Sequence, residues 1–115
     1  MLLLEDTDAL RLVTSAAVTV DVHASYVDYD GASPTTVPGR KNTAIATATT
    51  TDIVLAPASG FTRNVKMFSV RNKDVTPVAV TVVHFDGSVS VQLKKVTLEP
   101  EDELTWIEGV GFLML

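Results

Sequence analysis

Hydrophobic and polar residues alternate most clearly in the second half of the chain, on either side of an aspartate-glycine pair. Residues 77–85 read PVAVTVVHF, Asp86-Gly87 follows, and residues 88–98 read SVSVQLKKVTL. Alternating β-branched runs are typical of strands, and an intervening Asp-Gly favours a two-residue type I′ turn, whose two central residues both need positive φ. This stretch therefore predicts an antiparallel hairpin.

A second clear alternation runs over residues 17–29, which we expect to form a half-buried strand. Its apolar face carries Val18, Val20, Val22, Ala24 and Tyr26, and its polar face carries Thr19, Asp21, His23 and Ser25. Shorter strands are predicted at residues 2–5, 9–15, 64–71, 103–107 and 112–115, with residues 43–56 forming two strands that separate near 49–52. Such closely spaced short strands predict an all-β fold, a jelly-roll or β-sandwich of about eight antiparallel strands.

Two segments interrupt this pattern. Residues 30–42 contain two prolines and two glycines without periodicity, which predicts a loop of the length that is usually functional or mobile. Residues 99–103 (EPEDE) form the densest acidic run and predict a turn. The charged positions have two interpretations, either solvated loops and edges that discourage nonspecific sheet pairing or a surface complementary to a partner.

Length and composition favour one domain, residues 1–115, with an accessible surface of about 6,000 Å². Hydrophobic residues make up 46% of the chain and charged residues 20%, so we expect some apolar surface to lie against a partner. The net charge of -5 and the scattered basic residues disfavour direct nucleic-acid binding. The apolar residues 1–4 end at Glu5-Asp6 and are too short for a signal peptide or a membrane span, which predicts synthesis in the cytoplasm and no membrane partner.

Candidate chemistry is sparse. The chain has no cysteine, and its two histidines, His23 and His84, would need a carboxylate such as Asp21 or Asp86 beside them to bind metal or to act as acid and base. A packing or interface role is the favoured interpretation. Residues 28–33 (DYDGAS) partly match a calcium loop but lack the third early acidic ligand and the final glutamate. No metal, cofactor or catalytic residue is therefore assigned, and the expectation is a protein that is not an enzyme.

Several short motifs occur along the chain in a fixed order. They are Thr14-Ser15-Ala16-Ala17 ahead of residues 18–26, Pro38-Gly39-Arg40 with Asn42-Thr43-Ala44-Ile45, Arg63-Asn64-Val65-Lys66 with Val70-Arg71-Asn72-Lys73, residues 82–87 (VVHFDG) through Thr97-Leu98, and Gly109-Val110-Gly111-Phe112. In this order the motifs cover most of the chain, and they resemble small virion proteins of tailed bacteriophages. The nearest comparison is to jelly-roll capsid decoration, or cement, proteins. The chain departs from that pattern at Glu99-Pro100-Glu101 and in the apolar residues 1–4.

The resemblance implies a noncatalytic structural protein on the capsid surface of the virion, which stabilises the phage head by bridging major capsid protein subunits. The implied partners are further copies of the chain, as a homotrimer, and the major capsid protein. Alternatives are a tail or connector component, a receptor- or glycan-binding module that uses aromatics such as Trp106, and a small β-type enzyme. The candidate partner contacts are Met1, Leu2, Leu3, Leu4, Pro34, Val37, Pro38, Arg40, Lys41, Glu99, Glu101 and Asp102.

Overall fold

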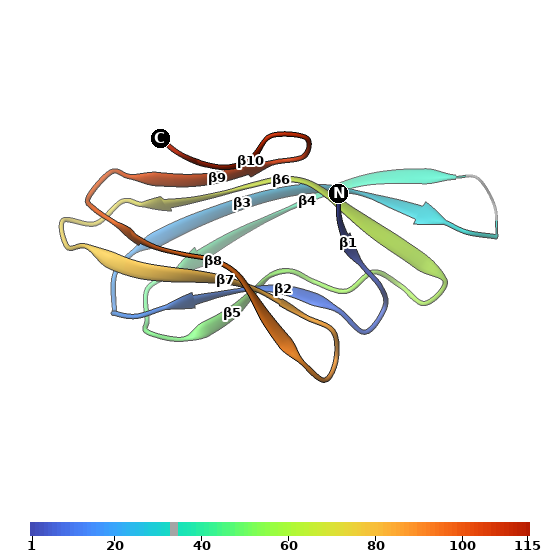
Figure 1. The fold of residues 1–115 in the computed structure, drawn as a ribbon, viewed down its shortest axis with the longest axis horizontal. Coiled ribbons are helices and arrows are strands. Elements are labelled where there is room, and N and C mark those ends of the chain that lie inside the picture. Colours follow the sequence, from blue (N-terminus) through green and yellow to red (C-terminus); the bar gives the residue numbers. More distant parts are fainter. Residues whose placement is uncertain (33–34) are drawn as a thin grey trace.

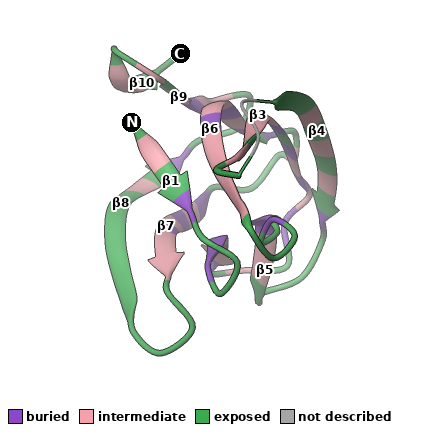
Figure 2. Ribbon diagram, turned by 90° about the vertical axis from the view of Figure 1, so that its right-hand side faces the viewer, coloured by how far each residue is buried: buried purple, intermediate pink, exposed green. Residues whose placement is uncertain are grey.

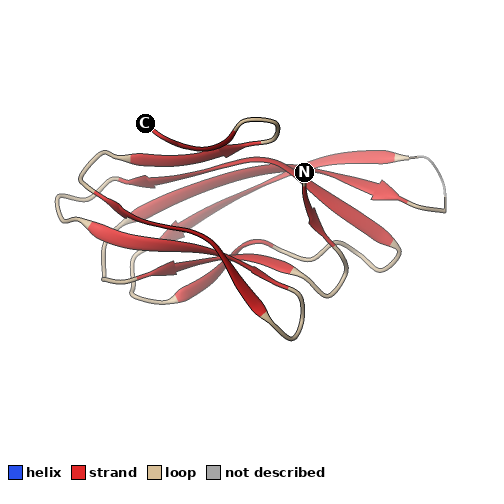
Figure 3. Cartoon of the chain, viewed as in Figure 1, coloured by secondary structure: helices blue, strands red, loops and turns tan. Residues whose placement is uncertain are grey.

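The computed structural model describes residues 1–32 and 35–115, which form ten strands in two antiparallel sheets (Figures 1 and 3). The strands are β1 (Leu2–Leu4), β2 (Ala9–Thr14), β3 (Val20–Asp30), β4 (Thr36–Ile45), β5 (Thr50–Val54), β6 (Phe61–Asn72), β7 (Val78–Phe85), β8 (Ser90–Leu98), β9 (Glu103–Ile107) and β10 (Gly111–Met114). The described residues contain no helix that is long and apolar enough to cross a membrane.

The larger sheet, sheet A, has the strand order β10-β9-β6-β3-β4, and β1 pairs with β6 from Leu2↔Val65 to Leu4↔Arg63. The smaller sheet, sheet B, has the order β5-β2-β7-β8 and forms the second layer (Figure 1). The predicted all-β sandwich of short antiparallel strands is confirmed. The described residues form ten strands, against the predicted number of about eight.

One hydrophobic core fills the space between the sheets. The predicted inner positions of β3 are buried, with Val20 and Ala24 at 0% exposure and Val22 at 3%. They pack in one cluster with Phe68 of β6 and Leu12 of β2. Figure 2 colours the buried positions of the strands purple. The accessible surface of 5,914 Å² agrees with the value of about 6,000 Å² expected for this chain length.

The predicted β7–β8 hairpin is confirmed, but the two-residue type I′ turn is wrong. The last strand pair is Phe85↔Ser90, so residues 86–89 form a four-residue loop. Gly87 has a φ of 93°, whereas Asp86 does not adopt positive φ. The Asp86 carboxylate instead accepts hydrogen bonds from the backbone N–H groups of Ser88 and Val89, at 3.0 and 2.7 Å. Asp side chains stabilise turns in this way, and the longer loop provides the donors.

The predicted loop at residues 30–42 is wrong over most of its length. β4 begins at Thr36, and β3 pairs with it continuously from Tyr29↔Thr36 to Val20↔Ile45. Proline is compatible with this strand because β4 is an edge, where a missing N–H does not interrupt a ladder. Gly39 is needed because the Tyr26 ring lies against it. The loop prediction was therefore wrong because it relied on proline and glycine content, which an edge strand also tolerates.

The break between the two strands predicted within residues 43–56 lies earlier in the chain than expected. The sequence pattern placed it near residues 49–52, but β4 ends at Ile45 and β5 already begins at Thr50. Thr14 of β2 holds the connection, because its hydroxyl donates to the carbonyl of Thr47 at 2.7 Å.

Two polar side chains connect the layers. Asn72 of β6 is fully buried, and its amide donates to the carbonyls of Thr76 and Leu98, at 2.9 and 3.0 Å. Arg63, also in β6, donates to both carboxylate oxygens of Asp28 at 2.7 and 2.9 Å and to the carbonyl of Leu55 at 2.8 Å. Polar side chains therefore link the two layers in addition to the apolar core.

Candidate functional site

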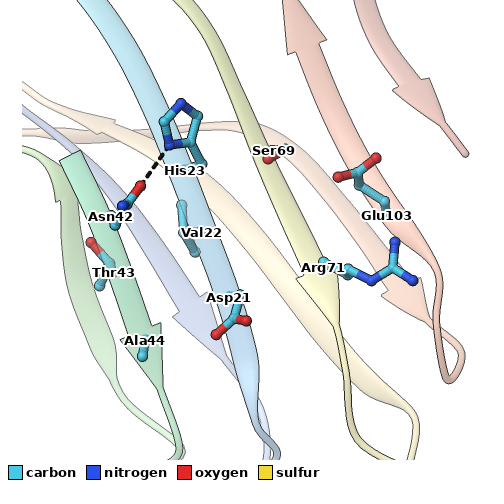
Figure 4. A pocket seen from close by; sticks show the side chains of 9 residues that line it. All are labelled: Asp21, Val22, His23, Asn42, Thr43, Ala44, Ser69, Arg71 and Glu103. Atoms are coloured by element: carbon cyan, nitrogen blue, oxygen red, sulfur yellow. Dashed lines mark hydrogen bonds between the residues drawn. The ribbon is translucent and has the colours of Figure 1, made fainter. Parts of the chain in front are cut away.

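A shallow groove of about 510 Å³ lies on the outer face of sheet A (Figure 4). Strands β3, β4, β6 and β9 supply its lining. The lining residues are Asp21, Val22, His23, Asn42, Thr43, Ala44, Ser69, Arg71 and Glu103.

Strand register brings the polar members of this groove into two rows. In the first row, Asp21 of β3 lies opposite Arg71 of β6, which lies opposite Glu103 of β9. In the second row, His23 lies between Asn42 and Ser69. Successive side chains of a strand point to opposite faces, so the polar residues that alternate with the core positions of β3 and β6 meet on the outer face.

Four side chains of the groove, those of Asp21, His23, Asn42 and Arg71, are paired within the chain. His23 and Asn42 form a 2.6 Å hydrogen bond in which the ring Nδ1–H donates to the amide oxygen (Figure 4). Lys73 lies 3.1 Å from Asp21, and Arg71 lies 2.6 Å from Glu101. The hydrogen bond to Glu101 raises the pKa of Arg71 further above its usual value. These groups present a mixed-charge surface that can form hydrogen bonds with a polar partner.

Ser69 and His23 lie opposite each other, but they do not form a nucleophile and base pair. In the described part of the chain no hydrogen bond joins their side chains, and the second ring nitrogen of His23 is not directed at Ser69 (Figure 4). The arrangement therefore lacks the hydrogen-bond reach that general-base activation of a serine requires.

The two histidines lie on different sheets. His84 is in β7 of sheet B, where its Nε2 lies 3.0 Å from the carbonyl oxygen of Leu3 and 3.7 Å from an oxygen of Asp8. Neither candidate carboxylate forms a site with both histidine rings. Asp21 pairs with Lys73, and Asp86 stabilises the hairpin loop. No group of three or more His, Cys, Asp or Glu side chains among residues 1–32 and 35–115 could hold a metal ion.

The carboxylates of the calcium-like segment have structural partners. Asp28 binds Arg63 through both oxygens, and Asp30 accepts a hydrogen bond from the backbone N–H of Ala32 at 3.0 Å. The last residue of the segment, Ser33, lies outside the described residues. Asp28 therefore acts in the packing of the sandwich.

The predicted N-terminal contacts divide into exposed and buried residues. Met1 is 83% exposed and Leu3 is 41% exposed. Leu4 is fully buried, and Leu2 packs against the core, because both side chains point inward from β1. Leu4 is therefore a core residue that is not available to a partner.

The other predicted contacts lie in two places far apart. Val37, Pro38 and Arg40 are exposed on the free edge strand β4, and Lys41 is half-buried. Pro34 lies outside the described residues. Glu99 and Glu101 are exposed, whereas the Asp102 carboxylate accepts a hydrogen bond from the Glu99 backbone at 3.0 Å. The beginning of β4 and the β8–β9 turn are at opposite ends of the long axis (Figure 1), so these regions do not form one patch.

Sequence reasoning did not single out the exposed apolar side chains near β10. Val110, Leu113, Met114 and Leu115 have exposures of 62%, 37%, 45% and 67%. The signal was present in the uncharged run GVGFLML at residues 109–115. The sequence predicts a last strand at residues 112–115, but a short apolar run does not reveal whether its outer side is covered.

Comparison with known proteins gives no relative: no protein-family model, curated protein or solved structure matches the chain.

Proposed function

We propose that the chain is a noncatalytic structural protein of a phage virion, a decoration or cement protein bound to the major capsid protein on the outside of the head. The sequence resemblance described above supports the phage assignment. The fold adds a physical reason for a structural role, because four side chains of its outer groove, those of Asp21, His23, Asn42 and Arg71, already have partners within the chain.

The observation that carries the proposal is the distribution of large apolar side chains on the surface. They are exposed at the N-terminus, at the β7–β8 hairpin, in the loop before β7 and around β10; examples are Met1, Val75, Val89, Val91, Val110 and Leu115. Separate apolar sites suit a protein that touches several neighbours, each through a small contact. A repeated shell offers such neighbours in fixed positions.

The oligomeric part of the proposal is a homotrimer, and the resemblance alone supports it. Many weak contacts between copies and with the shell would add their effects, so the head would gain resistance to internal pressure without one tight site.

Quantitative mass spectrometry of purified particles, combined with imaging of the intact particle, tests the proposal. We expect hundreds of copies per virion and density for the chain on the outer shell surface. A protein of the particle with known copy number serves as the internal standard. A few copies per particle, located at the tail or connector, would contradict the decoration role and favour the alternative component.

A glycan-binding module is the second candidate, and the groove is the observation that favours it. Its amide, carboxylate and guanidinium groups can donate to and accept from sugar hydroxyls. Isothermal titration with host-surface oligosaccharides measures this directly. Binding that is lost in Asn42→Ala and kept in the distant Val75→Ser variant would support it, and absence of heat with all oligosaccharides would exclude it.

A further inference from the structure

Strand β10 forms one free edge of sheet A, and its hydrogen-bond pattern with β9 is fixed. Leu115 and Glu103 exchange both backbone hydrogen bonds, at 2.8 and 3.1 Å. Bonded and non-bonded pairs alternate along antiparallel strands, so the pairs Leu113↔Thr105 and Gly111↔Ile107 are also bonded. The backbone N–H and C=O groups of Phe112 and Met114 therefore point away from β9, toward the free edge.

The other free edges of the two sheets carry features that oppose pairing. Lysines, arginines, aspartates and prolines on an edge strand discourage addition of another strand. Such residues are Pro38, Arg40 and Lys41 in β4, Asp52 in β5, and Lys94 and Lys95 in β8. Strand β1 is short, and the His84 ring contacts its Leu3 carbonyl. Among the described strands, β10 is the edge without a charge, a proline or a covering side chain.

We propose that β10 pairs with β10 of a second copy of this chain, antiparallel and around a two-fold axis at Leu113. Only one register satisfies the free groups of both copies: Phe112 opposite the second copy's Met114, and Met114 opposite the second copy's Phe112. Each of these pairs exchanges two backbone hydrogen bonds. The contact joins the two copies of sheet A into one continuous sheet.

The side chains fit this register on both faces. Phe112 and Met114 share the inner face, where the Phe112 ring packs edge-on against Phe68 at 6.0 Å. Pairing places the half-exposed Met114 beside the second copy's Phe112, a favourable sulfur-aromatic contact. Leu113, 37% exposed on the outer face, meets its own copy in a non-bonded pair, where facing side chains are closest. The strand carries no charge, so no like charges face each other.

A four-residue strand buries less than the roughly 800 Å² per partner of an ordinary stable interface, so we expect a weak dimer with a Kd of about 10 μM to 1 mM. This inference does not depend on a virion role. A dimer could form in a protein of any function, and a decoration protein could assemble through other surfaces.

Sedimentation equilibrium of the purified chain over this concentration range is the test. Leu113→Lys and Leu113→Glu each place two like charges opposite each other on the two-fold axis, so each variant alone should be monomeric. An equimolar mixture of the two should dimerise at least as tightly as the wild type, because opposite charges then face each other. Val75→Lys changes an 87% exposed apolar residue in the loop before β7 and should leave dimerisation unchanged.

A second variant distinguishes loss of pairing at the β10 edge from loss of the fold around β10. Met114→Pro removes an N–H that has no partner inside the chain, so β10 should stay on β9 while dimerisation is lost. Fluorescence of Trp106, opposite Phe112 in β9, reports whether β10 remains in place. A wild type that stays monomeric up to millimolar concentration would overturn the inference. So would an association whose stoichiometry and strength Leu113→Lys leaves unchanged, although a trimer of that kind would leave the proposed function standing.

Discussion

The ring of Tyr26 lies directly over the backbone of Gly39, so that a Cβ atom at position 39 would be 2.5 Å from Tyr26 Cε2. The ring cannot easily move away, because the Arg63 guanidinium lies over it at 3.8 Å from the centroid. Gly39, Tyr26 and Arg63 therefore form a compact group across β4, β3 and β6, at the end of the sandwich where the β3–β4 hairpin extends.

Replacing Gly39 with alanine should destabilise the protein by about 2 kcal/mol, because the added methyl group forces the ring or β4 to shift. Urea unfolding, followed by the fluorescence of the single tryptophan, measures the change. Gly31→Ala is the matched control, since a Cβ at position 31 has no atom within 4 Å. Equal stability of the two variants would show that β4 adjusts without cost.

Arg63→Lys should cost about 2 kcal/mol, because lysine cannot reproduce the two parallel bonds to Asp28. The Arg63 and Asp28 side chains are only 12% and 17% exposed, so water replaces the lost bonds poorly. The matched control is Lys73→Met, which breaks a pair whose side chains are 47% and 49% exposed and should cost less than about 0.5 kcal/mol. Thermal unfolding measures the loss of stability in both variants, and equal losses would contradict this argument.

Asn72→Ala should destabilise the protein by about 3 kcal/mol, because it leaves the buried Leu98 carbonyl without its donor. Asn64→Ala provides the comparison within one residue type. Within residues 1–32 and 35–115, the Asn64 amide oxygen is buried without a partner, and its nitrogen makes only a 3.4 Å contact with Glu108. Loss of this side chain should therefore cost less than about 1 kcal/mol. Denaturant unfolding of the two variants should therefore separate them clearly.

Glu108 should contribute to a loss of stability in acid. The hydrogen bond from Lys66, at 2.8 Å, lowers the pKa of Glu108 in the folded chain. A lowered pKa stabilises the fold above the ordinary carboxylate pKa of about 4, and this stabilisation is lost as the pH falls through the folded value. Glu108→Gln should therefore show a smaller difference in stability between pH 6 and pH 3 than the wild type.

Lys66→Met tests the cause of that dependence, because it removes the donor and keeps the carboxylate. It should reduce the pH dependence in the same direction as Glu108→Gln. Chemical unfolding at a series of pH values measures both. A pH profile in either variant that matches the wild type would assign the acid sensitivity elsewhere, for example to Asp74 and Asp86. Hydrogen bonds from backbone N–H groups lower the pKa of both.

Local pattern was sufficient for most of the strands, but it was insufficient for β4 and for the connections between strands. The alternation from Val20 to Ala24 and the predicted strand at residues 103–107 match β3 and β9. Side chains of a strand point alternately to its two faces, so a half-buried strand can be recognised from its own sequence. Pro38 and Gly39 misled the prediction, since proline at an edge and glycine beneath a ring are tertiary effects. The Asp86 turn also depended on which donors its carboxylate reaches.

The groove could not be predicted from sequence for a related reason. His23, Asn42, Ser69 and Arg71 come from three strands, and only sheet register places them side by side. The outer polar positions of each strand were visible, but the order of strands in a sheet is not encoded locally. The same applies to Leu4, whose burial depends on the pairing of β1 with a distant part of β6.

The charges on β4, β5 and β8 also bear on behaviour at high concentration. Fibril growth needs two open edges per molecule, one to accept the preceding unit and one to template the next. With Lys94 and Lys95 on one side of sheet B, Asp52 on the other, and Arg40 on the far side of sheet A, β10 is the one unprotected edge among the strands that the structure describes, so end-to-end polymerisation would terminate after a single addition.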